Sequence, residues 1–168
     1  MAGRALLVVL LLPYALWLVF DYEYHFLDGV NLLFHEAGHV FFGLGGRTLH
    51  FLGGTLGQLF FPLAAAVHFL GRGRAFDAWI CVLWLGESLM YAAEYVADAR
   101  VQLLPLVGGH VHDWHWLLTR WGLLLQAERL GAALHAFAGV LVLGALVAAA
   151  REVWREYREY RPDPVTAL

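Results

Sequence analysis

Residues 30–44 read VNLLFHEAGHVFFGL, an apolar segment with the polar group His35-Glu36-Ala37-Gly38-His39 at its centre. On a helix, residues i and i+4 share a face, so His35 and His39 can offer two imidazole nitrogens to one Zn²⁺ ion. Glu36 then lies beside the metal, where it can take a proton from water and pass it to a leaving amine. Ionisable groups within an apolar segment are costly, so this motif indicates a functional site.

Composition independently indicates a membrane protein. The 168 residues fit one domain, covering 1–168; 61% of them are hydrophobic and only 15% are charged. The net charge is −3, and none of the basic residues is Lys, so no basic face for nucleic acid is expected. The single cysteine, Cys81, excludes an internal disulfide. The expected surroundings are therefore a lipid bilayer, and the oligomeric state is left open.

Apolar segments predict an all-α polytopic fold with about five transmembrane helices. The first segment could be a secretory signal, but no small-residue cleavage site follows it, which favours a retained span. The third contains a glycine-rich stretch and Pro62, and the fifth is rich in Ala, Leu and Val. The predicted spans are residues 5–20, 29–44, 51–70, 76–97 and 130–150.

Three further segments are not expected to span. Gln102–Gly109 (QLLPLVGG) is apolar but short and broken by Pro105, as in a re-entrant or broken loop. Trp114–Gln126 carries Arg120 at its middle, which is typical of an interfacial amphipathic helix. Residues 151–161 alternate in charge at i,i+4 spacing and predict a charged helical tail that extends the last span into water.

The arginine distribution says little about orientation. Five spans put the termini on opposite faces. A cytoplasmic C-terminus places six arginines inside, namely Arg72, Arg74 and those of the tail, against five outside, a small bias in its favour. We expect a multi-pass protein of a bacterial cytoplasmic membrane with that orientation.

A catalytic zinc site usually has three protein ligands, so a third ligand must come from elsewhere in the chain. Asp28 lies seven residues before His35, which on a continuous helix is roughly 10.5 Å along the axis. Zinc–oxygen bonds are only about 2.0–2.2 Å long, so Asp28 cannot reach the same ion. It is better suited to cap the N-terminus of the helix that carries His35.

The fourth span supplies the first candidate. Glu87, Tyr91, Glu94 and Asp98 follow a 4-3-4 spacing and form one polar stripe on an apolar helix. Acidic groups in a span need a cation or each other, and Zn²⁺ on the neighbouring helix would stabilise them. We expect Asp98, which ends the stripe and precedes the broken loop, to be the third ligand. The alternative is an interfacial ion pair between Asp98 and Arg100.

Alternative third ligands follow the broken loop. His110, His112 and Asp113 stand together in a sequence that also contains His115. Asp113 has a competing structural role as the N-cap of the helix beginning at Trp114. His110 and His112 have no evident structural role, and a re-entrant loop could bring them to the metal. Asp113, His112, Glu94 and His110 therefore remain candidates for the third ligand or for groups that support it.

These motifs resemble the site-2 protease type of intramembrane zinc metalloproteases. The resemblance rests on HEAGH at 35–39, a glycine-rich helix at Gly53–Pro62 and the broken segment Gln102–Gly109, which together cover about half of the chain. In that family a later, partly unwound span carries an Asn and a Leu-Asp-Gly whose Asp is the third ligand. This chain departs from that pattern, with Gln102 in place of the Asn and Val107 before the glycines.

A shorter resemblance concerns Glu94-Tyr95-Val96-Ala97-Asp98. It is similar to the E-x-x-A-D motif of membrane zincins that process prenylated proteins, where the Glu is a metal ligand and the Asp supports the site. That resemblance implies Glu94 as a ligand and Asp98 as its support.

The sequence thus predicts a membrane-embedded zinc metalloprotease that hydrolyses peptide bonds of membrane or juxtamembrane substrates. Glu36 is the expected general base, with His35, His39 and Asp98 as zinc ligands. Two alternatives remain: a non-catalytic membrane protein that binds or transports a metal ion or ligates haem through the same histidines, and a structural membrane subunit. The sequence leaves open whether the site is active or belongs to a pseudo-protease.

Overall fold

The computed structural model describes residues 2–107 and 111–160, and every regular element within those ranges is helical. The predicted all-α fold class is therefore confirmed. The elements in chain order are α1 (Ala2–Phe20), α2 (Phe26–Phe42), the 3₁₀ turn η1 (Gly43–Gly45), α3 (Arg47–Gly71), α4 (Ala75–Asp98), α5 (Asp113–Arg120), the 3₁₀ turn η2 (Leu124–Gln126) and α6 (Ala127–Tyr160).

Four helical segments in the described ranges are long and apolar enough to cross a membrane: α1, α3, α4 and the segment Leu124–Tyr160, which contains α6. Large apolar side chains project outward from them, including Val9 (65% exposed), Phe60 (59%) and Val140 (73%). In water such exposure would be costly, whereas lipid tails accommodate it. The architecture is that of a helical membrane protein.

The second of the predicted spans is a helix with a polar inner face, and it is shorter than the four helices suited to spanning. Residues 29–44 were expected to cross the bilayer, but the structure has α2 at Phe26–Phe42, and its 17 residues are not among the helices suited to spanning. At 1.5 Å per residue α2 is about 25 Å long. Its buried side chains include Asp28, Asn31 and His35, so the helix is apolar only on its outer side. Within the described residues, four helices thus have the length and hydropathy of a membrane span, against about five predicted.

The start of α2 also differs from the expectation. His25, not Asp28, occupies the N-cap position, and Asp28 lies three residues later in the first turn. The Asp28 carboxylate accepts the backbone N–H of His25 (2.8 Å) and the hydroxyl of Tyr22 (2.6 Å). Asp28 thus binds a free amide at the helix N-terminus, as expected of a capping residue, but from inside the helix.

The segment after α4 is non-helical as far as residue 107, in agreement with the expected break at Pro105. The amphipathic helix that follows is shorter than the expected Trp114–Gln126. α5 ends at Arg120, and Gly122 adopts a φ of +69°, a conformation that suits glycine and reverses the chain before η2. The tail continues α6 as a helix through Tyr160, as predicted.

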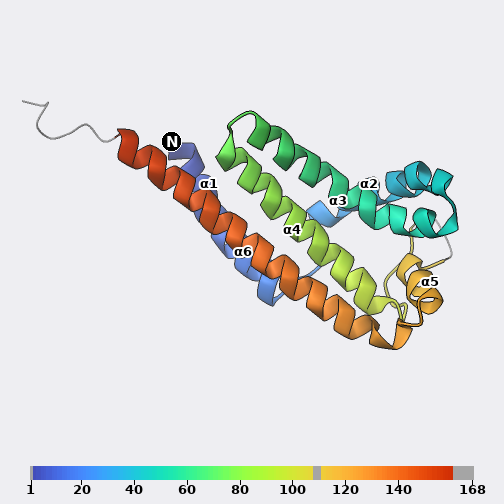
Figure 1. Ribbon diagram of the computed structural model, residues 1–168. Helices are drawn as coiled ribbons and strands as arrows, with labels where there is room; N and C mark the ends of the chain where they lie inside the picture. The colour runs from blue at the N-terminus through green and yellow to red at the C-terminus, as the bar shows by residue number, and fades with distance from the viewer. Residues whose placement is uncertain (1, 108–110, 161–168) are drawn as a thin grey trace, which may run out of the picture.

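The helices pack around α4 and α6. In Figure 1, α3 and α4 form an antiparallel hairpin, α6 runs along α4, and α1 lies beside α6. Leu18, Met90, Ala138 and Val142 are fully buried where α1, α4 and α6 meet. α5 contacts α3 and α4 at the end of the bundle where α3 begins and α4 ends. The contact between the His35–His39 motif of α2 and the first residue of α5 lies at that end.

Glycines bring α2 and α3 into direct backbone contact. A Cβ added at Gly38 would collide with the carbonyl of Gly53, and one added at Gly57 would lie 2.5 Å from the carbonyl oxygen of Phe34. Small residues at such positions let two helices approach closely, and van der Waals contact then fixes their separation. Because Gly38 lies between His35 and His39 in sequence, this contact sets the place of both imidazoles.

We predict that Gly38→Ala lowers the free energy of unfolding by about 1–3 kcal/mol, because the added methyl forces α2 away from α3. Gly144→Ala on α6 is the matched control, since a Cβ there meets no atom within 4 Å. Thermal unfolding of both variants in detergent checks this. Equal unfolding temperatures for the two variants would contradict the backbone contact.

Candidate metal centre

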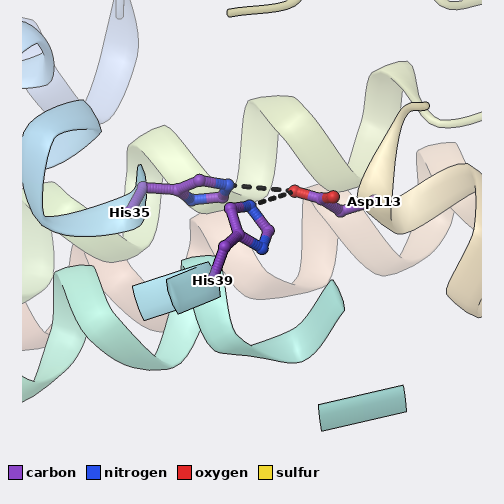
Figure 2. A group of neighbouring side chains, drawn as sticks. All are labelled: His35, His39 and Asp113. Atoms are coloured by element: carbon purple, nitrogen blue, oxygen red, sulfur yellow. Dashed lines mark hydrogen bonds and ion pairs between the residues drawn. The ribbon is translucent and has the colours of Figure 1, made fainter. Parts of the chain in front are cut away.

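His35, His39 and Asp113 converge at the end of the bundle, as Figure 2 shows. The Nε2 atoms of His35 and His39 lie 3.0 and 3.1 Å from the same carboxylate oxygen, Oδ2 of Asp113. One ligand atom from each of the three residues lies within 4.8 Å of the other two. Two histidines of α2 and the first residue of α5 therefore form a group of the size that holds a metal ion.

The other ring nitrogen of each imidazole, Nδ1, is fixed by a hydrogen bond to a neighbouring oxygen. Nδ1 of His35 lies 2.9 Å from Oε1 of Gln58, whose amide nitrogen donates to the carbonyl of Ser88 (2.9 Å). That second bond orients the amide so that its oxygen faces His35, and Nδ1 must then be the donor. Nδ1 of His39 likewise donates to the carbonyl of His50 (2.7 Å). Both histidines are thereby left with Nε2 as the metal-binding nitrogen.

A glycine makes room for the first imidazole. A Cβ on Gly54 would lie 2.5 Å from Cε1 and 2.6 Å from Cδ2 of the His35 ring. No side chain larger than hydrogen fits there without moving the ring. The glycine-rich start of α3 therefore sets both the distance between α2 and α3 and the space for a candidate ligand.

Asp113 is buried, and burial alone opposes its ionisation. The close contacts with His35 and His39 outweigh burial and hold the pKa of the Asp113 carboxyl below its usual value. Its backbone N–H donates to the hydroxyl of Tyr95 (3.2 Å). An ionised carboxylate beside two imidazoles is a ligand set that suits a divalent cation.

This donor set fits zinc. Two imidazole nitrogens and one carboxylate oxygen are the protein ligands of one class of hydrolytic zinc site, in which the fourth position is left for water. The same two-histidine, one-carboxylate set also occurs in non-haem iron(II) sites, so ligand type alone does not choose the metal.

A cleft opens beside the three residues, with a volume of about 510 Å³. Glu36 lies on its wall and is half-buried, and no side-chain hydrogen bond or ion pair engages its carboxylate within the described residues. The segment after α4 also lines the cleft, with Leu104, Pro105 and Val107. The cleft thus combines a free carboxylate and a candidate metal group with an apolar wall.

The expectation that Asp98 joins the histidines is not what the structure shows. Asp98 ends α4, and its carboxylate turns back onto the following segment, where it accepts the N–H groups of Leu103 (2.8 Å) and Leu104 (3.1 Å). It also lies 3.3 Å from Nε2 of His112. Asp113, an alternative third ligand, takes the place beside the histidines. The alternative pairing of Asp98 with Arg100 is absent as well, since Arg100 pairs with Glu128 (2.5 Å).

Two other candidates, His112 and Glu94, lie outside the group. His112 is buried and, instead of Asp113, is the N-cap of α5, with Nδ1 accepting the N–H of His115 (3.2 Å). Glu94 is exposed and lies 4.0 Å from His135, towards α6. His110 lies outside the described residues.

Sequence reasoning missed three supports of the site: Gln58, His50 and Tyr95. The sequence does carry a signal for Gln58, because a polar amide side chain within an apolar span needs a buried hydrogen-bond partner. The carbonyl of His50 carries no sequence signal, since any residue supplies one.

Comparison with known proteins adds no relative. No protein-family model matches the chain, and neither curated proteins nor solved structures give a match.

We predict that Asp113→Ala weakens Zn²⁺ binding by more than about 100-fold, because one of three protein ligands is removed. Asp77→Ala, at the start of α4 and paired with Arg74, should leave affinity unchanged. Competition with a chromophoric chelator, on purified protein in detergent, measures both. Wild-type affinity in Asp113→Ala would place the metal elsewhere.

Proposed function

We propose that the protein is a membrane-embedded zinc metallopeptidase that cleaves apolar peptide segments. The observation that carries the proposal is the convergence of His35, His39 and Asp113 on the wall of a cleft that also holds Glu36. The sequence order His-Glu-x-x-His resembles that of metallopeptidases, in which the glutamate acts as general base.

A zinc ion supplies a Lewis acid that lowers the pKa of water to about 7 and polarises a carbonyl group. His35, His39 and Asp113 would hold it. Gln58 and the carbonyl of His50 would keep the two imidazoles in the orientation that presents Nε2. Because these partners are already in place, little rearrangement is needed on metal binding, which favours affinity.

Glu36 is suited to proton transfer. It follows His35 directly, so the helix carries it to the same cleft, and its carboxylate is free of other partners among the described residues. In hydrolysis the carboxylate accepts a proton from the attacking water and returns it to the leaving amine. A purely metal-binding role has no need of a carboxylate at this position.

The cleft wall supports an apolar peptide as substrate. Apolar side chains line much of the cleft, namely Leu32, Leu104, Pro105, Leu106 and Val107. Apolar side chains of a substrate would bury surface there at roughly 25 cal/mol per Å². The position of the site, at one end of helices suited to spanning a membrane, favours substrates within or next to the bilayer.

We predict that Glu36→Gln retains zinc but slows peptide hydrolysis by about 10²–10⁴-fold, because the amide cannot accept a proton. The assay uses proteoliposomes and a quenched fluorescent apolar peptide, with zinc measured on the same samples. Glu94→Gln is the matched control, since this exposed carboxylate points towards His135 and away from the cleft.

Hydrolysis at the wild-type rate in Glu36→Gln would show that Glu36 is not the base. If the wild-type protein binds one zinc ion but cleaves no apolar peptide, the alternative of a non-catalytic metal-binding or transport protein takes its place.

A further inference from the structure

The connection between α4 and α5 is anchored at its beginning by one buried carboxylate. Asp98, the last residue of α4, is 8% exposed. Its Oδ1 accepts the N–H of Leu103 at 2.8 Å, and its Oδ2 accepts the N–H of Leu104 at 3.1 Å. Charge-assisted bonds of this kind are stronger than those between neutral groups. Asp98 thereby fixes the direction in which the chain leaves α4.

The same carboxylate faces the end of the connection. Nε2 of His112, a side chain 1% exposed, lies 3.3 Å from Oδ2 of Asp98. Nδ1 of His112 accepts the N–H of His115, so the ring proton must be on Nε2. That N–H has no aligned hydrogen-bond acceptor among the described residues, which leaves the negative charge of Asp98 as its compensation.

His112 is joined directly to the candidate metal ligand Asp113. Its ring stacks on Tyr95 with the centroids 4.0 Å apart, and the hydroxyl of Tyr95 accepts the N–H of Asp113. The His112 ring also caps α5, which begins at Asp113. The start of α5 at Asp113 is thus held by the His112 cap and by the hydroxyl of Tyr95, and the His112 ring in turn lies against Asp98.

We propose that Asp98 is a positioning residue of the metal centre: acting through His112, it places the carboxylate of Asp113 against His35 and His39. Asp98 is not itself a ligand. This inference rests on the proposed function, because it requires that the centre binds metal. Groups that orient metal ligands usually change affinity by 10–100-fold when they are replaced.

The test compares Asp98→Asn with His112→Asn. Asp98→Asn removes the negative charge that faces Nε2 of His112, and its amide nitrogen faces an N–H donor, so at least one hydrogen bond of Asp98 is lost as well. In His112→Asn the new side-chain oxygen can still cap α5, but nothing extends to Asp98. The second variant therefore separates the contact with Asp98 from the stability of the helix, and it decides the question should Asp98→Asn fail to fold. Glu128→Gln is the control, an exposed carboxylate at the same end of the bundle that pairs with Arg100.

The readouts are Co²⁺ affinity, the Co²⁺ d–d absorption spectrum and thermal unfolding of the metal-free protein, all in detergent. We expect each asparagine variant to raise the dissociation constant about 10–100-fold and to alter the d–d spectrum. The double variant, Asp98→Asn with His112→Asn, should bind no more weakly than the weaker single variant, because both changes act on the contact between Asp98 and His112. Glu128→Gln should match the wild type.

A dissociation constant within twofold of the wild type in folded Asp98→Asn or His112→Asn would overturn the inference, even if the unfolding temperature falls. That result would leave the contact a purely structural role. If the wild-type protein binds no metal, the proposed function fails, and the inference fails with it.

Discussion

The carboxylate of Asp113 lies 3.0 and 3.1 Å from the Nε2 atoms of two imidazoles of α2, and this contact joins the first half of the chain to the second. A buried carboxylate without partners would be very costly, and here both partners belong to one helix face. The residues that accompany the contact are arranged around it. Tyr95 receives the backbone N–H of Asp113, and the carbonyl of His50 and the amide of Gln58 hold the two rings.

The contact depends in turn on how closely α2 and α3 approach. With Gly38, Gly53 and Gly57 at the crossing, the two backbones touch, and Gln58 and His50 come within hydrogen-bonding distance of His35 and His39. A larger side chain at the crossing would separate the rings from both acceptors at once. A helix pair that packs through backbone has little freedom to slide, so the two imidazoles are pre-organised for a common ligand.

Much of this could be read from the sequence because the signals are local. The i,i+4 spacing of His35 and His39 and the apolar segments follow from helix periodicity alone. The choice between Asp98 and Asp113 does not, because it depends on the path of the non-periodic connection after α4. Asp98 also has the stronger local claim, as the end of a polar stripe, yet its carboxylate is used by the N–H groups of Leu103 and Leu104. The polar inner face of α2 was also not predicted from the hydropathy of residues 29–44, because average hydropathy does not distinguish the two sides of a helix.

We propose that His35, His39 and Asp113 together bind a metal ion. X-ray absorption at the zinc edge of the purified protein tests it most directly. We expect nitrogen and oxygen ligands at about 2.0–2.1 Å from the zinc, together with the outer-shell scattering of two imidazoles. The imidazole scattering should be lost in the double variant His35→Ala/His39→Ala. A sulfur shell at about 2.3 Å, or imidazole scattering that persists in that double variant, would contradict it.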